Sequence, residues 1–196
     1  MTNLRRALLV VDFQRDFCDG GTLAVAGADE LVPKLNAVID IFSRASLPVF
    51  FTRDWHPANH VSFKAQGGPW PPHCIQGSLG AAFHPKLRMP PRAVIVDKGT
   101  KPDSEAYSGF DGTDLQKRLE ASGVGEVFIG GLATDYCVKQ TALDARKWGL
   151  KVSVLEDCIR GVDLTAGDSD LALRELVARG VKLVRSSMVL KLAMVK

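Results

Sequence analysis

Short apolar runs rich in β-branched residues recur along the chain, and segments with helical periodicity separate them. Six such runs span residues 7–13, 49–52, 93–96, 127–129, 152–155 and 181–184. None alternates apolar and polar residues as a half-exposed strand does. The pattern therefore predicts strands that are buried on both faces of a parallel sheet.

The intervening segments predict helices. Residues 28–46 place Leu35, Val38 and Phe42 at helical spacing. A capping box, Thr113 to Gln116, is expected to open a helix that ends near residue 123. Helices over 135–148 and 167–179 are each followed by a glycine that suits a helix end. Strands that alternate with helices predict a single α/β domain over residues 1–196, with an open, mostly parallel six-stranded sheet and helices on both faces.

Composition narrows the class of protein. The 196 residues are 46% hydrophobic and 24% charged, which is typical of a globular domain. The net charge of +3 comes from interleaved acids and bases, so a nucleic-acid-binding stripe is not expected. The four cysteines are far apart in sequence, and no apolar run approaches the length of a membrane span. These features favour a soluble, cytoplasmic protein with no membrane partner.

Two segments interrupt the alternation of strands and helices. Residues 54–92 hold all four histidines and two of the three tryptophans but no clear periodicity, and residues 99–112 form the second interruption. Long loops inside compact domains usually carry function. We therefore expect the chemistry of the protein to involve the longer segment.

Three chemically active residue types lie at or just after the ends of predicted strands. Asp12 is in the first apolar run, Lys98 follows the third, and Cys137 follows the glycine-rich end of the fourth. Ligands of open α/β sheets bind at the carboxyl ends of the strands. Cys137 is also expected in the first turn of a helix, where free N–H groups stabilise a thiolate or an oxyanion.

Each of these residues also has a structural interpretation. Asp12 alone could cap a loop amide, Lys98 alone suits a surface position, and Cys137 alone suits a small buried apolar site. Together they supply an acid/base, a cation and a nucleophile, which favours acyl transfer. Because every histidine lies in the long segment, we expect Asp12 rather than a histidine to accept the thiol proton.

The long segment also carries a candidate metal site. Asp54 and His56 are two residues apart, and His60 and His73 follow. One carboxylate with two or three imidazoles suits zinc, iron or manganese and leaves coordination positions open. The alternative is a loop scaffold of hydrogen-bonded histidines. His84, farther along, is not included in this set, and Cys74 is interpreted as a buried filler.

Several motifs resemble those of the nicotinamidases, a family in the isochorismatase-like cysteine hydrolase superfamily. They are VVDFQRDFCDGGTL (10–23), DWHPANH (54–60), WPPHC (70–74), KG (98–99), YSGF (107–110) and GLATDYCV (131–138). The Asp/Lys/Cys set is shared across the superfamily. The DWH and WPPH segments are narrower and point to the nicotinamidases themselves.

The resemblance implies an Asp12–Lys98–Cys137 triad that hydrolyses nicotinamide to nicotinate and ammonia through a thioester, with activity on pyrazinamide-like analogues. It also implies a cis peptide before Ala133, whose N–H would join that of Cys137 in an oxyanion hole.

The resemblance further implies that Asp54, His56 and His73 hold a divalent metal, for which zinc is the first choice and iron or manganese remain open. Whether His60 is a direct ligand also stays open. For the substrate ring we expect contacts from three aromatic residues, Phe17, Trp70 and Tyr136.

Two other functions remain open at this stage. A related cysteine amidase acting on a carbamoyl or ureido compound would share the triad but would have little use for the metal ligands. A non-catalytic metal- or thiol-sensing module would use Cys137 as a redox switch. The sequence does not decide the oligomeric state, and a homo-oligomer remains open.

Overall fold

The computed structural model describes residues 4–189 and contains one six-stranded sheet at its centre. All the strand pairs are parallel, and the strand order is β3-β2-β1-β4-β5-β6. The strands are β1 (Arg5–Val11), β2 (Val49–Asp54), β3 (Val94–Lys98), β4 (Val124–Leu132), β5 (Lys151–Arg160) and β6 (Lys182–Val184). The predicted open α/β sheet is confirmed, and it is parallel throughout.

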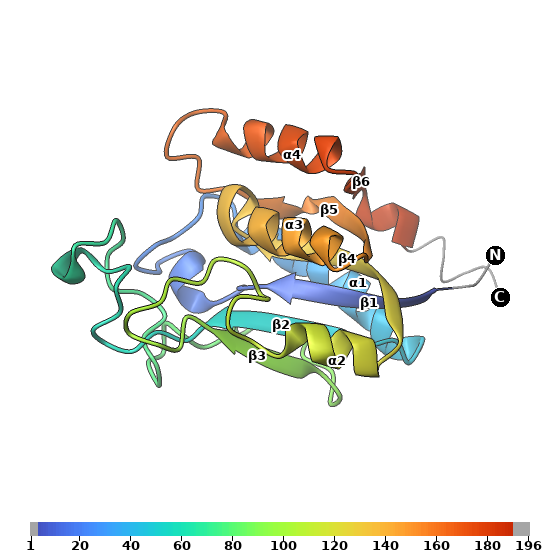
Figure 1. The fold of residues 1–196 in the computed structure, drawn as a ribbon, viewed down its shortest axis with the longest axis horizontal. Coiled ribbons are helices and arrows are strands. Elements are labelled where there is room, and N and C mark those ends of the chain that lie inside the picture. The colour runs from blue at the N-terminus through green and yellow to red at the C-terminus, as the bar shows by residue number, and fades with distance from the viewer. Residues whose placement is uncertain (1–3, 190–196) are drawn as a thin grey trace.

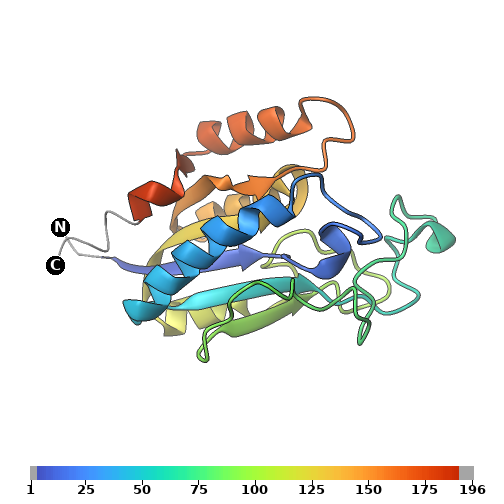
Figure 2. The same ribbon diagram turned by 180° about the vertical axis from the view of Figure 1, so that it is seen from behind.

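Helices cover both faces of this sheet (Figures 1 and 2). Helix α1 (Val32–Arg44) packs on one face, where its buried residues join one apolar cluster with Leu8 and Val10 of β1. Helices α2 (Leu115–Ala121), α3 (Lys139–Lys147) and α4 (Asp168–Ala178) contribute to a second cluster with Leu9 and Val11. Successive β1 side chains thus enter opposite cores, which explains the lack of polar alternation in this strand.

The helix boundaries follow the sequence signals closely, with three differences, of which the third concerns the segment around Cys137. A short 3₁₀ turn, η2 (Asp29–Leu31), precedes α1, so the α-helix begins later than residue 28. The capping box is wrong: Asp114 is the N-cap of α2 and its side chain makes no capping bond. Instead the Thr113 hydroxyl donates to the Gly109 carbonyl and accepts the Leu115 N–H. The Thr113 side chain therefore stabilises the turn before the helix and does not form the expected capping box.

The Cys137 segment also differs from the expected α-helix. Residues Thr134–Val138 form a π-helical turn, η4, in which the Val138 N–H donates to the Ala133 carbonyl at 3.0 Å. The regular helix α3 starts only at Lys139. Such wide turns are rare and are often found at functional sites, because they redirect a side chain without ending the helix.

The sheet topology defines where a ligand binds. The chain runs outward from β1 through β2 to β3, then returns to β4 on the other side of β1. This reversal opens a crevice at the carboxyl ends of the central strands. The long segment between β2 and β3 lies beyond these ends (Figure 1) and contains only the short turn η3 (Lys64–Gln66) and isolated bridges.

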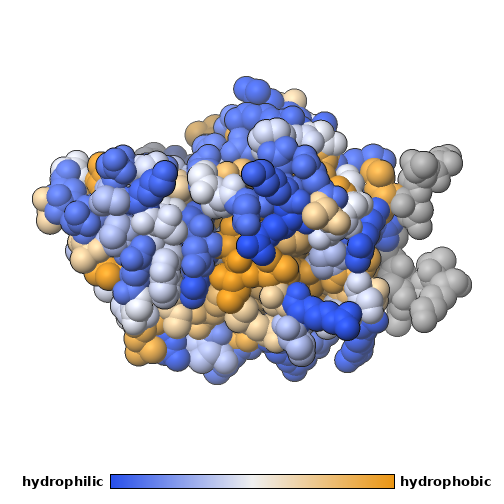
Figure 3. Space-filling view, turned by 60° about the horizontal axis from the view of Figure 1, so that its bottom comes forward, coloured by the Kyte–Doolittle hydropathy of each residue, from blue (hydrophilic) through white to orange (hydrophobic). Residues whose placement is uncertain are grey.

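The surface along the β3 edge is partly apolar. Ile95 of β3 and Met89, just before this strand, are exposed, and Figure 3 shows apolar surface gathered on this side of the molecule. Among the described residues, no helix is both long and apolar enough to span a membrane.

Candidate functional site

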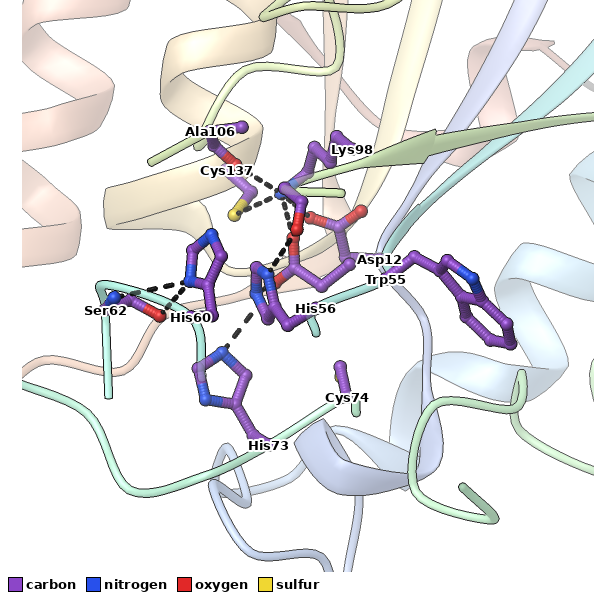
Figure 4. A network of polar contacts seen from close by, with 12 residues as sticks. Asp12, Trp55, His56, His60, Ser62, His73, Cys74, Lys98, Ala106 and Cys137 are labelled. Atoms are coloured by element: carbon purple, nitrogen blue, oxygen red, sulfur yellow. Dashed lines mark hydrogen bonds and ion pairs between the residues drawn. The ribbon is translucent and has the colours of Figure 1, made fainter. Parts of the chain in front are cut away.

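The carboxyl ends of β1 and β3 and the turn after β4 bring Asp12, Lys98 and Cys137 together. Lys98 Nζ lies 3.0 Å from Asp12 Oδ2 and 3.5 Å from Cys137 Sγ, and it donates a 2.9 Å hydrogen bond to the Ala106 carbonyl. All three side chains are buried. Figure 4 shows Lys98 reaching between the aspartate and the sulfur. The three residues expected to act together are therefore in contact.

Asp12 is held in an unusual backbone conformation. Its φ is +45°, a left-handed value that costs a residue with a Cβ some strain. Its N–H donates to the Thr52 carbonyl at 3.1 Å, and its Oδ1 accepts the Thr52 hydroxyl at 2.7 Å. Within residues 4–189, the contact of Oδ2 is the ion pair with the Lys98 ammonium at 3.0 Å.

Burial dominates the protonation of the triad. Desolvation raises the pKa of the Cys137 thiol well above 9.0, and the nearby Lys98 charge offsets this only in part. Desolvation by itself lowers the pKa of Lys98, but Asp12 and Asp54 raise it well above 10.5 overall. The expected helix-end thiolate is therefore wrong for this site. Cys137 rests as a thiol and needs a base, while Lys98 stays charged.

A second group of side chains adjoins the triad through Asp54. Asp54, His56 and His73 each offer a ligand atom within 4.8 Å of the others, and all three are buried. His56 Nε2 lies 3.5 Å and His73 Nε2 lies 3.9 Å from Asp54 Oδ2. Burial raises the pKa of Asp54, but Lys98 lowers it overall below 3.8, so the carboxylate stays ionised.

The two histidines are oriented as metal ligands are. His56 Nδ1 donates to the Gly99 carbonyl at 2.9 Å, and His73 Nδ1 donates to the Pro71 carbonyl at 2.8 Å. A carbonyl only accepts, so Nδ1 carries a proton in each ring, and in the neutral form the Nε2 lone pair is available to a metal. Both Nε2 atoms lie near the same carboxylate oxygen, which is the arrangement found around bound metals.

His60 differs from its neighbours in this respect. Its ring stacks on His56 with centroids 4.0 Å apart, as Figure 4 shows. Its Nδ1 accepts the Ser62 N–H at 3.3 Å and lies 2.7 Å from the Ser62 hydroxyl, and its Nε2 donates to the Ser104 carbonyl at 3.1 Å. Both ring nitrogens are therefore engaged, and the structure gives His60 a supporting position behind His56.

A narrow cavity of about 40 Å³ connects the two groups of side chains. Cys137, Ala133, His73 and Asp54 all line it. The three aromatic residues expected around a substrate ring, Phe17, Trp70 and Tyr136, all line it. The Leu132–Ala133 peptide is cis, as expected.

Three residues of this site were missed at the sequence level. Tyr107 lines the cavity, and its hydroxyl accepts the Trp70 indole N–H at 3.0 Å. Buried Gln14 brackets the Asp54 backbone, donating to its carbonyl at 2.7 Å and accepting its N–H at 2.8 Å. Thr52 bonds Asp12. Thr52 could have been found from the sequence, because it is a polar residue at the end of an otherwise apolar strand run.

His84 lies outside this site, as expected. It is near Cys18 and Asp29, and its Nε2 is 3.2 Å from Asp29 Oδ2. Its Nδ1 accepts the Lys86 N–H at 3.3 Å. The ring proton is therefore on Nε2 and bonds Asp29, so His84 ties its loop to the turn before α1.

The family of the chain follows from a comparison with family models. The isochorismatase domain model matches residues 6–188. The chain belongs to the isochorismatase family. This match covers every candidate catalytic and metal-ligating residue named above.

Curated relatives and solved structures agree with this assignment. The nicotinamidase of Escherichia coli is 41% identical over 91% of this chain and 93% of its own length. The nicotinamidase/pyrazinamidase of Mycobacterium tuberculosis is 42% identical over 93% of this chain and 100% of its own. The crystal structure of Pyrococcus horikoshii pyrazinamidase in complex with zinc is 49% identical and has a TM-score of 0.89. The match covers 92% of this chain and 99% of that chain.

Proposed function

We propose that this protein is a nicotinamidase, which hydrolyses nicotinamide to nicotinate and ammonia through a thioester on Cys137. The observation that carries the proposal is the single cavity that joins Cys137 to the Asp54–His56–His73 group. The names of the relatives from Escherichia coli and Mycobacterium tuberculosis support the substrate class. Pyrazinamide, a related aromatic carboxamide, is expected to be a second substrate.

In the first half of the reaction, the Cys137 thiol transfers its proton to Asp12 Oδ2 and the sulfur attacks the carboxamide carbon. The position of Oδ2 beside Lys98, which also contacts the Cys137 sulfur, supports this assignment. Collapse of the tetrahedral adduct breaks the C–N bond, and Asp12 returns the proton so that ammonia leaves neutral. Asp12 then takes a proton from water as the hydroxide adds to the thioester, and it returns that proton to the sulfur as the C–S bond breaks. The free thiol is restored, and the nicotinic acid loses its own proton to solvent and leaves as nicotinate.

Lys98 and two backbone amides stabilise the charges that develop. The Lys98 ammonium lies 3.5 Å from Cys137 Sγ and favours the sulfur as it becomes negative. We assign the oxyanion to the N–H groups of Ala133 and Cys137, which flank the cavity wall. Loss of one such donor in other enzymes costs about 2.7–4 kcal/mol of transition-state stabilisation.

Asp54, His56 and His73 would hold a divalent metal, and zinc suits one carboxylate and two imidazoles. The orientation of both histidine Nδ1 atoms toward carbonyl oxygens supports this fit. Zinc is present in the Pyrococcus horikoshii structure. When bound, the metal supplies a Lewis-acid position for the pyridine nitrogen of the substrate. Phe17, Trp70 and Tyr136 would contact the ring and set the carboxamide against Cys137.

The metal donors also separate this function from its alternatives. A cysteine amidase for a carbamoyl or ureido substrate has no ring nitrogen to place and little use for the Asp54 group. A thiol-sensing module has no use for Asp12 beside a buried thiol whose pKa is raised by desolvation. Both the donor set and the triad are accounted for by a pyridine carboxamide substrate.

The decisive experiment measures ammonia release from nicotinamide before and after chelation, together with mass spectrometry of acid-quenched enzyme. We expect metal-dependent release and a nicotinoyl adduct on Cys137. Benzamide, which lacks the ring nitrogen, should be a poor substrate and should lose comparatively little on metal removal. Metal-dependent hydrolysis that persists in Cys137→Ala, with no adduct in the wild type, would overturn the thioester route.

A further inference from the structure

Thr52 contacts the proposed base from the neighbouring strand at two points. Its carbonyl accepts the Asp12 N–H at 3.1 Å, and its hydroxyl donates to Asp12 Oδ1 at 2.7 Å. Thr52 is fully buried on β2, two residues before Asp54. It is not among the residues that line the cavity, so we expect any effect it has on the reaction to act through Asp12.

The two oxygens of Asp12 therefore have different surroundings. Oδ1 accepts a hydrogen bond from the neutral Thr52 hydroxyl, whereas Oδ2 lies 3.0 Å from the Lys98 ammonium. A protonated carboxyl carries its hydrogen on one oxygen only. While the Thr52 O–H is directed at Oδ1, a proton on Oδ1 requires the hydroxyl to rotate and give up that bond. A proton on Oδ2 leaves the bond to Thr52 intact.

We propose that Thr52 is a positioning residue that keeps the transferred proton of Asp12 on Oδ2, the oxygen beside Lys98. The inference rests on the proposed role of Asp12 as the proton acceptor. Without the Thr52 hydroxyl the carboxyl group can turn, and the proton can occupy the oxygen that faces away from Lys98. Proton return to ammonia then becomes slower, while substrate binding is unchanged.

The rotamer of Thr52 is itself fixed by packing. A Cβ built on Gly109 would lie only 2.8 Å from the Thr52 methyl group, so the glycine backbone closely supports that methyl. The Gly109 N–H donates to the Thr141 hydroxyl at 2.9 Å, which holds this backbone in place. β-Branched side chains have few accessible χ1 rotamers. The packed methyl therefore keeps the hydroxyl directed toward Asp12. A serine has no methyl group, so its hydroxyl would point toward Asp12 for a smaller fraction of the time.

Two matched comparisons test the proposal. The first compares wild type with Thr52→Val, which removes the hydroxyl and keeps the shape of the side chain. The second compares Thr52→Ser with Thr52→Ala, which both lack the methyl and differ from each other only in the hydroxyl. Each metal-loaded enzyme is assayed for kcat and KM with nicotinamide, for metal content, and for the rate of nicotinoyl–Cys137 formation in rapid-quench mass spectrometry. Ser153→Ala, the loss of a buried hydroxyl on β5, is the control.

We expect kcat and the adduct rate to fall at least about tenfold in Thr52→Val, with KM and metal content close to wild type. Thr52→Ser should exceed Thr52→Ala by a similar factor. Packing alone would give the reverse pattern, with Thr52→Val active and the serine and alanine variants equally impaired, and this pattern would overturn the inference. If Thr52→Val does not fold, the serine and alanine pair decides by the same criterion.

Asp12→Asn separates this inference from the proposed function. An active Asp12→Asn enzyme refutes Asp12 as the base, whatever Thr52 does. An inactive Asp12→Asn enzyme with an unimpaired Thr52→Val refutes the positioning role alone.

Discussion

Lys98 and Asp54 form a buried ion pair that connects the nucleophile to the metal-ligating group. Lys98 Nζ donates to Asp54 Oδ1, while Oδ2 of the same carboxylate faces His56 and His73. The lysine also pairs with Asp12 and contacts Cys137. One ammonium group therefore pairs with both carboxylates, so a change at one part of the site alters the electrostatics of the other.

Cys137→Ala and Cys137→Ser should lose activity without losing the fold. Cys137→Ala removes the sulfur and Cys137→Ser replaces it with oxygen, and neither changes another heavy atom. Turnover should therefore fall on the order of 10⁴-fold or more. Ammonia release and near-wild-type circular dichroism are the measurements. Cys158→Ala, a buried cysteine outside the cavity, is the matched control and should keep its activity. Near-normal turnover in a folded Cys137→Ala would refute covalent catalysis.

Lys98→Met should destabilise the protein strongly. The change leaves two buried carboxylates without their cation, and loss of one partner of a buried pair costs about 3–5 kcal/mol. The free energy of unfolding in urea tests this. Lys147→Met removes an exposed lysine that pairs with Asp144 and should change that free energy little.

The same Lys98→Met variant should be less reactive toward alkylating agents. The Lys98 charge lowers the pKa of Cys137, so its removal raises that pKa further and moves the alkylation profile to higher pH. The rate of iodoacetamide reaction against pH, measured on folded variant, reports the shift. An unchanged profile would leave Lys98 with a structural role only.

The histidines should divide into two functional classes. His56→Ala and His73→Ala should abolish binding of about one metal ion per chain and weaken nicotinamide binding, because each removes a free Nε2 lone pair. Cys137 should still react with a small alkylating agent. His60→Gln should keep the metal, since both ring nitrogens of His60 already bond protein groups. Metal analysis by mass spectrometry decides, and loss of the metal in His60→Gln would make His60 a ligand.

The pH dependence of kcat/KM should show an acidic limb above pH 3.8. Burial is the main cause that raises the pKa of Asp12 from that value, and Lys98 and Thr52 offset it in part. Asp12 must be ionised to accept the thiol proton. Activity is therefore present above the raised pKa and is lost as the pH falls through it. A limb below pH 3.8 would contradict this assignment.

Much of the fold was predictable because the signals were local. Each of the six apolar runs corresponds to a strand, and the lack of polar alternation within a run was the signal that predicted it. Pro33 lies in the first turn of α1, where its missing N–H is tolerated. The Thr113 capping box failed because the hydroxyl accepts the Leu115 N–H, two residues on, and donates to the Gly109 carbonyl, four residues back. Both bonds close the turn before the helix, since a threonine side chain can bond nearby backbone groups in several local ways.

By itself the sequence determined which residue types stand at strand ends and in the long segment. It thereby predicted that Asp12, Lys98 and Cys137 act together and that a histidine-rich group binds a metal, because strand order places carboxyl ends at one edge. Only the tertiary structure decided the hydrogen-bond partner of each ring nitrogen, and with it the separation of His60 from His56 and His73. It also decided that Thr52 bonds Asp12 and that burial keeps Cys137 protonated. Hydrogen-bond direction and desolvation depend on atoms brought together from distant parts of the chain, which residue spacing does not encode.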